Sequence, residues 1–274
     1  MPEATFQPAA EIGGFLDAIF NRYGYDLHGY APSSLRRRVR AAVSKFGLSD
    51  VGELQRKSVA DPYFFGTVLT TLTVHVTEMF RDPAFYLAFR RQVVPILRTY
   101  PYFSVWHGGC ATGEEAYSLA ILLAEEGLAG RCQIYATDVN PHSVEHAKLG
   151  IYRDEAVATF AANYRAAGGR RDPGCYLTRA YGRVSISEQL RRSILFFQHD
   201  LVGDHAVGQM HVIFCRNVMI YFGQPLKEQV TAKLGARLHP LGFLCLGKSE
   251  QLARPSRASF VEFSVPHRIY RRVS

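Results

Sequence analysis

From about residue 101 onward, short apolar runs alternate with helical stretches, and no other feature of the chain limits its fold as strongly. The runs are rich in β-branched and aromatic residues, as strands buried on both faces are. Such strands, alternating with helices, predict a parallel sheet covered by helices. The runs are FSVWHGG (residues 103–109), CQIYATDV (132–139), ILFFQHDL (194–201), HVIFCRNV (211–218) and GFLCLGKSE (242–250).

The first 70 residues have a different pattern, in which apolar residues recur at helical spacing. We expect helices in EIGGFLDAIFNRYG (residues 11–24), SSLRRRVRAAVSKFG (33–47), SDVGELQRKSV (49–59) and YFFGTVLTTL (63–72). The second helix is expected to begin at a serine N-cap. Together they predict a small helical domain. Further along, the alternation in CYLTRAYGRVSIS (175–187) predicts a small antiparallel excursion.

Bulk properties limit the class of protein. A chain of 274 residues predicts one large and one small domain. Neither a signal peptide nor a run of roughly 18 apolar residues is present, so we expect a cytoplasmic protein that is not inserted in a membrane. Five cysteines without a CxxC pair indicate neither a disulfide framework nor a metal site. The net charge of +8 is compatible with an acidic protein, a nucleic acid or an anionic membrane as partner.

The strongest local signal is VWHGGCATGEEAYSLAILLAEE (residues 105–126), where an apolar strand runs through a glycine-rich turn into an amphipathic helix. Open α/β sheets bind nucleotides at such turns, and the glycines allow a close backbone approach to a ligand. The spacing matches neither common phosphate-binding motif. Glu114 and Glu115 suit a ligand with a cationic group, such as the amino group of a methionine moiety. Alternatively, they only complement the helix dipole.

Asp138 follows the next apolar run, about 25 residues after the glycine turn. A carboxylate at this place hydrogen-bonds the ribose hydroxyls of a nucleoside ligand. Alternatively, it only caps the next helix. Glycine turn, glutamate pair and aspartate together predict a nucleoside site, and NAD stays open as its ligand on these features.

Five further segments carry a resemblance to a known family. They are TVHVTEMFRDPAFY (residues 73–86), GGCATGEEAYSLA (108–120), ATDVN (136–140), IFCRNVMIYF (213–222) and GKSE (247–250). With these motifs in this order, the chain resembles the CheR family of chemoreceptor glutamate O-methyltransferases. FLDAIFNRYGYDLHGYAPSSLRRRVRAAVSKFGLSD (15–50) is similar to that family's first helices, so the resemblance covers nearly the whole chain.

The resemblance implies a class I methyltransferase fold that binds S-adenosylmethionine and releases S-adenosylhomocysteine. Its sheet is seven-stranded and mostly parallel. We expect a helical N-terminal domain over residues 1–74, an interdomain segment at 75–100 that contributes to the cofactor site, and a catalytic domain over 101–274. A small antiparallel β-subdomain is expected within about 151–196.

The resemblance also assigns residues to the site. Thr77 and Arg81 would reach the cofactor from the interdomain segment, with His75 beside them. Glu115 would bind the methionine amino end, and Asp138 would bind the ribose. Asp200 and Leu201 would flank the adenine. Arg216 and Asn217 would line the pocket. Arg81 and Tyr221 are the candidates nearest the reacting methyl group. The family usually has asparagine where His75 and Asp200 stand, and often histidine where Lys248 stands.

Methyl transfer from a sulfonium to a carboxylate is an in-line displacement. The attacking glutamate is ionised at neutral pH, since its ordinary pKa is about 4.3, so no general base is required. Catalysis should rest on alignment of the reacting atoms, an effect of about 7 kcal/mol or more. We expect Arg81 to hold the cofactor carboxylate and Tyr221 to hydrogen-bond near the reacting centre.

The expected partner is the acidic helical bundle of methyl-accepting chemotaxis receptors. It would dock on the basic helix through Arg36, Arg37 and Arg40, and possibly on the β-subdomain, with the enzyme as a monomer. Alternatively, these arginines only form a solvated helix face.

Two other functions stay open. The first is a CheR-like module that binds the cofactor without catalysis, and the second is a nucleic-acid methyltransferase. The second is disfavoured because neither a D/N-P-P-[YFW] stretch nor a Pro-Cys pair is present.

Overall fold

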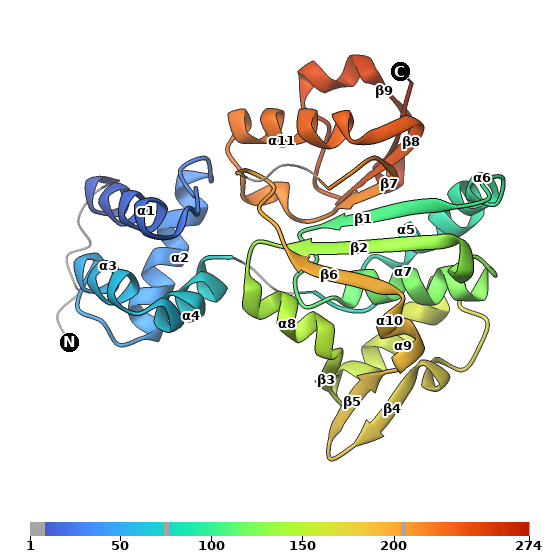
Figure 1. The fold of residues 1–274 in the computed structure, drawn as a ribbon, viewed down its shortest axis with the longest axis horizontal. Helices are drawn as coiled ribbons and strands as arrows, with labels where there is room; N and C mark the ends of the chain where they lie inside the picture. Colours follow the sequence, from blue (N-terminus) through green and yellow to red (C-terminus); the bar gives the residue numbers. More distant parts are fainter. Residues whose placement is uncertain (1–8, 74–76, 204–206, 274) are drawn as a thin grey trace.

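The computed structural model describes residues 9–73, 77–203 and 207–273. Its N-terminal domain consists of α1 (Ala9–Tyr23), α2 (Pro32–Lys45), α3 (Val51–Ala60) and α4 (Pro62–Leu72). These helices pack around their own apolar core, with Phe15, Ile19 and Leu54 fully buried. All four predicted helices are therefore present. In Figure 1 this domain lies to one side of the sheet, with α2 and α4 nearer to it than α1 and α3.

The predicted serine cap of the second helix is wrong. Helix α2 begins at Pro32, its N-cap is Ala31, and no side chain caps it. Proline suits the first helical position because its fixed φ matches the helix and its missing N–H would have no intrahelical partner there. The start of this helix is thus set by Pro32.

A seven-stranded sheet forms the centre of the molecule, in the order β6-β2-β1-β7-β8-β10-β9. The strands β6, β2, β1, β7 and β8 are parallel, and β10 is antiparallel to both of its neighbours. The five predicted strands are all present; β9 and β10 are known only from the structure. The bounds are β1 (Phe103–Gly108), β2 (Cys132–Asp138), β6 (Ile194–Gln198), β7 (Met210–Cys215), β8 (Leu238–Leu246), β9 (Phe260–Ser264) and β10 (Ile269–Arg272).

Helices cover both faces of this sheet. Alternate side chains along each strand point to opposite faces, so Val105 packs in one core and Trp106 in the other. The first core includes α5 (Pro83–Ala88), the π-helix η1 (Phe89–Val93), α6 (Val94–Leu97), α7 (Glu114–Glu125) and α8 (Pro141–Leu149). The second includes α11 (Gln224–Ala236). Short 3₁₀ turns lie at η2 (Ala129–Arg131), η4 (Met219–Tyr221), η5 (Arg254–Ser259) and η6 (Val265–His267).

The predicted antiparallel excursion is confirmed as a three-stranded sheet in the order β3-β5-β4. It projects from the lower part of the sheet domain, in yellow in Figure 1. Its elements are β3 (Ile151–Arg153), α9 (Ala156–Ala166), η3 (Pro173–Tyr176), β4 (Leu177–Ala180), β5 (Arg183–Ile186) and α10 (Glu188–Arg192). Among the described residues, no helix combines the length and the apolar character that crossing a membrane requires.

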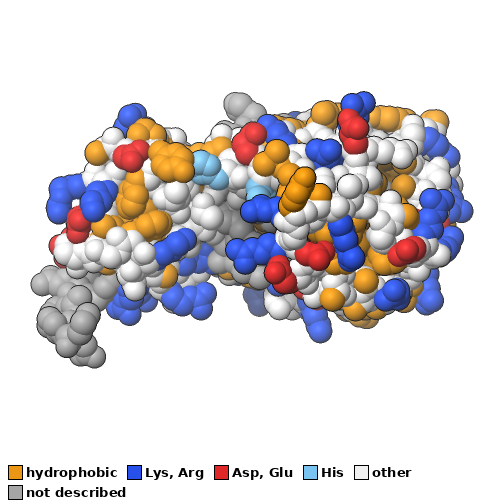
Figure 2. Space-filling model, turned by 90° about the horizontal axis from the view of Figure 1, so that it is seen from below, with side chains coloured by type: hydrophobic (Ala, Val, Ile, Leu, Met, Phe, Trp, Pro, Cys, Tyr) orange, Lys and Arg blue, Asp and Glu red, His pale blue; other side chains and the backbone are white. Residues whose placement is uncertain are grey.

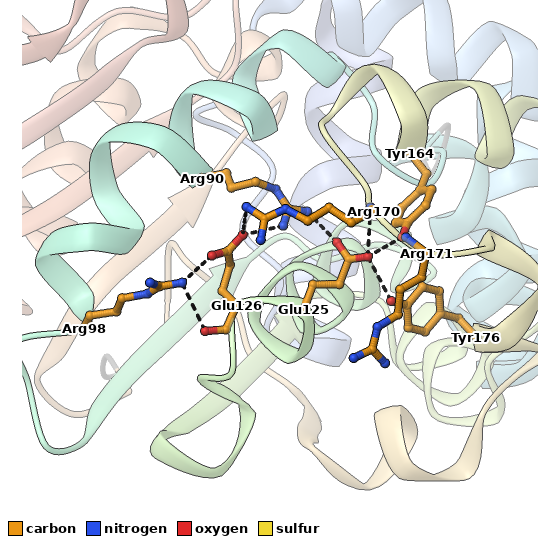
Figure 3. A network of polar contacts seen from close by, with 8 residues as sticks. All are labelled: Arg90, Arg98, Glu125, Glu126, Tyr164, Arg170, Arg171 and Tyr176. Carbon is orange, nitrogen blue, oxygen red and sulfur yellow. Dashed lines mark hydrogen bonds and ion pairs between the residues drawn. The ribbon is translucent and has the colours of Figure 1, made fainter.

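A buried polar network anchors this insertion to the end of α7 (Figure 3). The carboxylate of Glu125 accepts hydrogen bonds from Arg90 Nη2 at 2.8 Å, Tyr176 Oη at 3.1 Å and the Arg170 backbone N–H at 3.2 Å. The Tyr164 hydroxyl donates to it as well. The Glu125 and Arg90 side chains are only 2% and 5% exposed. One buried carboxylate thus links η1, α9 and the segment leading to β4.

We predict that Glu125→Gln lowers the free energy of unfolding by roughly 2–3 kcal/mol, because it leaves the Arg90 charge less compensated in the interior. Urea denaturation would measure this change. The matched control is Glu188→Gln, which removes an exposed pair with Arg192 and should change stability by less than about 0.5 kcal/mol. Equal effects of the two substitutions would contradict the anchoring role.

Candidate functional site

A cavity lies where the carboxyl ends of β1, β2, β6 and β7 meet, as Rossmann-like sheets place their ligand sites. The N-terminal domain and the segment after residue 76 complete its wall. Nine of the ten predicted site residues line this one cavity; the tenth, His75, lies outside the described residues. The nine are Thr77, Arg81, Glu115, Asp138, Asp200, Leu201, Arg216, Asn217 and Tyr221.

The glycine turn after β1 is held against the neighbouring strand. The backbone N–H groups of Gly109 and Cys110 both donate to the Thr137 carbonyl, each at 2.8 Å. Gly109 has a φ of +82°, and a Cβ at this position would lie 2.5 Å from Val218 Cγ2. Glycine is therefore required here by a protein neighbour as well as by the left-handed backbone. The expected close approach to a ligand is not the only reason for this glycine.

Asp138 lies at the end of β2 and does not cap α8, whose N-cap is Asn140. It lines the cavity, while its Oδ2 accepts a hydrogen bond from the Ala111 backbone N–H at 2.8 Å. Its Oδ1 accepts another from Asn140 N–H at 2.9 Å, at the start of α8. The same carboxylate therefore fixes the glycine turn and presents an acceptor at the end of β2, where ribose hydroxyls bind in this type of fold.

The two neighbouring glutamates at the start of α7 have different environments. Glu115 lines the cavity, whereas Glu114 is outside it and accepts a hydrogen bond from Thr112 Oγ1 at 2.6 Å. Burial raises the pKa of Glu114 to about 7. Of the two glutamates, Glu115 is therefore the one whose carboxylate can face a ligand in this cavity. Glu114 is instead hydrogen-bonded to Thr112 in the same turn.

Arg216, at the end of β7, connects three segments around the cavity. Its side chain is 1% exposed and donates to Glu115 Oε1 at 2.5 Å and to Asp82 Oδ2 at 2.9 Å. Its guanidinium carbon lies 3.9 Å from the centre of the Phe85 ring. Burial by itself raises the pKa of Glu115, but the charge of Arg216 and the His107 ring outweigh it, so the pKa lies below its usual value. Glu115 is therefore ionised at neutral pH.

As far as its residues are described, the cavity lining has a surplus of negative charge, because it contains the carboxylates of Glu115, Asp138 and Asp200 and the guanidinium groups of only Arg81 and Arg216. Two carboxylates, Glu115 and Asp82, share the single guanidinium of Arg216. A ligand with a cationic group compensates the surplus, whereas the pyrophosphate of a dinucleotide would be repelled. Asp82 was not among the predicted site residues, although it directly follows Arg81 in the resembling segment TVHVTEMFRDPAFY.

Glu250 organises the turn that carries Asn217 and Tyr221. It is 4% exposed. Its Oε2 accepts hydrogen bonds from the backbone N–H groups of Asn217 at 2.9 Å and Gly247 at 2.6 Å, and its Oε1 from that of Ile220 at 3.1 Å. Asn217 has a φ of +59°, in the left-handed region. The GKSE segment thus contributes a buried carboxylate that holds this backbone, while Lys248 is exposed.

The N-terminal domain contacts the same turn from the other side. The guanidinium carbon of Arg38 lies 4.1 Å from the centre of the Tyr221 ring, and Arg38 Nη1 donates to the Leu72 carbonyl. The Ala31 backbone N–H donates to the Tyr221 carbonyl at 2.9 Å. Arg38 is only 4% exposed, and Tyr30 lines the cavity. The basic cluster of α2 is thus divided, with Arg38 facing inward.

Sequence reasoning assigned Arg36, Arg37 and Arg40 to docking and gave Arg38 no role. A signal was present, since Leu35, Val39 and Ala42 are buried on the same side of the helix and Arg38 follows Leu35 by three positions. Asp200 lines the cavity as predicted, and its Oδ1 also accepts from the Val202 backbone N–H at 2.8 Å.

The strand order, the acidic residue after β2 and the anionic end of α7 define the class: an S-adenosylmethionine-dependent methyltransferase of class I. Comparison with known proteins is more specific. The profile described as CheR methyltransferase, SAM binding domain, matches residues 75–267, and that of the CheR all-alpha domain matches residues 10–73. The chain therefore belongs to the CheR methyltransferase family, and its methyl donor is S-adenosylmethionine.

Individual relatives agree with this family. The Pseudomonas putida protein named as methyltransferase Cher3 is 43% identical over 263 residues, which are 96% of each chain. The chemotaxis protein methyltransferase of Klebsiella aerogenes is 30% identical over 87% of this chain and 82% of its own. That of Listeria monocytogenes is 28% identical over 85% of this chain and 87% of its own.

We predict that Glu250→Gln weakens the binding of S-adenosylhomocysteine about tenfold. The amide nitrogen of glutamine would face backbone N–H donors, and an unsatisfied buried donor costs about 1–3 kcal/mol, where 1.4 kcal/mol is a factor of ten. Titration calorimetry would measure the dissociation constant. The control is Glu145→Gln, an exposed residue of α8, which should bind as the unchanged protein does; an unchanged affinity in Glu250→Gln would contradict the prediction.

Proposed function

We propose that this protein transfers a methyl group from S-adenosylmethionine to glutamate side chains of methyl-accepting chemotaxis receptors. The names of the relatives support a role in chemotaxis. The contact between Arg38 and Tyr221 is the observation that supports an anionic acceptor. It puts a buried cation beside the residue proposed nearest the reacting centre. The enzyme would then be located in the cytoplasm, where it would meet the receptor.

The residues of the cavity fit the cofactor. Bound S-adenosylmethionine supplies an electrophilic methyl group on a sulfonium. The carboxylate of Glu115 would hold the methionine amino group, and Arg81 its carboxylate. Asp138 would accept hydrogen bonds from the ribose hydroxyls. Asp200 and Leu201 would flank the adenine, with Asn217 at the pocket wall.

The acceptor needs alignment and no proton transfer. A glutamate with a pKa near 4.3 is already ionised at neutral pH, so the protein is required only to hold its oxygen in line with the methyl group and the leaving sulfur. Tyr221 and Arg38 would orient that carboxylate, Tyr221 by its hydroxyl and Arg38 by its charge. Such positioning lowers the barrier by about 7 kcal/mol or more in well-oriented reactions.

Docking would use the exposed side of α2. Arg36, Arg37 and Arg40 line a shallow groove on this helix together with Ser33 and Ser44. Arginine-rich grooves attract acidic surfaces and increase the rate of encounter. The acidic helical bundle of a receptor would therefore lie along α2, the helix whose Arg38 contacts the cavity residue Tyr221.

The proposed activity can be tested with labelled S-adenosylmethionine and a soluble receptor fragment that contains the methylation helices. We expect alkali-labile label on the receptor, and a loss of at least tenfold in kcat/KM in Arg81→Ala, since a charged contact of about 1.4 kcal/mol or more is removed. Normal binding of S-adenosylhomocysteine without any methyl ester would favour a non-catalytic binding module. Label on DNA or RNA instead would favour the nucleic-acid class.

The docking role of α2 leads to a separate prediction. Arg36→Gln/Arg37→Gln/Arg40→Gln should raise the KM for the receptor about tenfold at low salt, because exposed charge pairs contribute about 0.5 kcal/mol each. The KM for S-adenosylmethionine should stay unchanged. The control removes as many exposed charges outside α2 and outside the β-subdomain, in Arg22→Gln/Arg56→Gln/Arg91→Gln. If both triple variants have the same KM for the receptor, α2 is not the docking helix.

A further inference from the structure

A second basic surface lies on the opposite side of the turn that carries Tyr221. A polar groove there is lined by Lys227 of α11 and by Arg254 and Arg257 of η5. An adjoining groove contains Arg257 and Arg268, and Arg268 Nε donates to the Lys248 carbonyl at 3.4 Å. We call Lys227, Lys248, Arg254, Arg257 and Arg268 the C-terminal basic surface.

The positive charge of this surface is poorly compensated. Within the part of the chain that the structure describes, none of its five cations forms an ion pair with a carboxylate. The two grooves contain two carboxylates, Glu250 and Glu262. Glu250 is buried and bound to backbone N–H groups, so Glu262 is the exposed one. The surface therefore fits an anionic partner.

The C-terminal basic surface lies next to the turn that carries Tyr221. Met219 and Ile220 form one wall of the groove, and Ile220 is 38% exposed. The next residue in the same 3₁₀ turn, Tyr221, lines the cofactor cavity. Arg38 of α2 lies against Tyr221 from the N-terminal domain. The turn is thus bordered by α2 on one side and by the C-terminal basic surface on the other.

Basic side chains are not confined to the C-terminal basic surface; the view from below Figure 1, on the side away from α11, contains others. Lys and Arg side chains lie on both lobes of the molecule and on both sides of the waist between them (Figure 2). On an acidic helix, carboxylates three, four or seven residues apart lie on one face, and seven residues span about 10 Å. Such a helix presents further negative charges on both sides of any one glutamate.

We propose that the C-terminal basic surface binds the acceptor protein together with α2. It would take an acidic stretch of the helix that carries the reacting glutamate, while α2 takes the stretch on the other side. Contacts on both sides of the reacting residue determine which glutamate along the helix reaches Tyr221. The surface would therefore contribute to the choice of methylation site. This proposal rests on the proposed function, since it assumes an acidic helical acceptor.

The test uses the full chain and the soluble receptor fragment, with S-adenosylhomocysteine present. Lys227→Gln/Lys248→Gln/Arg254→Gln should weaken binding of the fragment about tenfold in fluorescence anisotropy at low salt, from three exposed charge contacts. The difference should shrink as salt screens these contacts. Affinity for S-adenosylhomocysteine should stay the same. Combination with the α2 triple variant should multiply the two effects, as expected for separate contacts.

The control is again Arg22→Gln/Arg56→Gln/Arg91→Gln, which leaves the β-subdomain unchanged. Arg22 lies on α1, Arg56 on α3 and Arg91 in η1, and all three are exposed. Equal binding by the control and the Lys227→Gln/Lys248→Gln/Arg254→Gln variant would overturn the proposal. So would a loss of affinity for anionic vesicles or DNA with an unchanged affinity for the receptor fragment.

The two proposals fail in different ways. If the unchanged protein methylates the receptor but the C-terminal variant has a normal KM and the same pattern of methylated glutamates, only the second surface is refuted. If the unchanged protein forms no methyl ester yet its binding of the fragment depends on these lysines and Arg254, the surface stands and the catalytic proposal falls.

Discussion

The ion pairs of Arg216 with Glu115 and Asp82 are the interactions on which the site depends. They join the end of β7 to the start of α7 and the start of α5, three segments far apart in the chain. A guanidinium buried to this degree is tolerated only with such partners, because an unpaired interior charge is strongly unfavourable. Glu115 also lines the cavity as an ionised carboxylate, which suits a cationic donor.

The second constraint is the turn between β7 and α11. Glu250 holds its backbone from beneath, and Arg38 and Ala31 contact it from the N-terminal domain. A side chain that must orient an acceptor benefits from such support, because small displacements reduce the rate strongly. The helical domain is therefore part of the cavity wall, and its position determines where Tyr221 lies.

Much of the site could be predicted because the family motifs lie at strand ends, where parallel strands bring their carboxyl ends to one edge of the sheet. Asp138, Arg216 and Asn217 were found in this way, and all three line the cavity. Arg38, Asp82 and Glu250 were missed because each acts through a partner distant in sequence. No local pattern identifies Tyr221 as the neighbour of Arg38, or the Asn217 turn as the neighbour of Glu250.

The sequence by itself determined the classes of element: the helices of the first 70 residues, the five parallel strands and the antiparallel insertion. These follow from hydrophobic periodicity and glycine positions, which are local properties. Tertiary structure decided which charges are compensated. It turned Arg38 inward while its neighbours on α2 face a groove, and it brought Lys227, Lys248 and Arg254 to one surface beside the turn that carries Tyr221. Charge balance depends on distances between segments, and packing of the whole chain sets those distances.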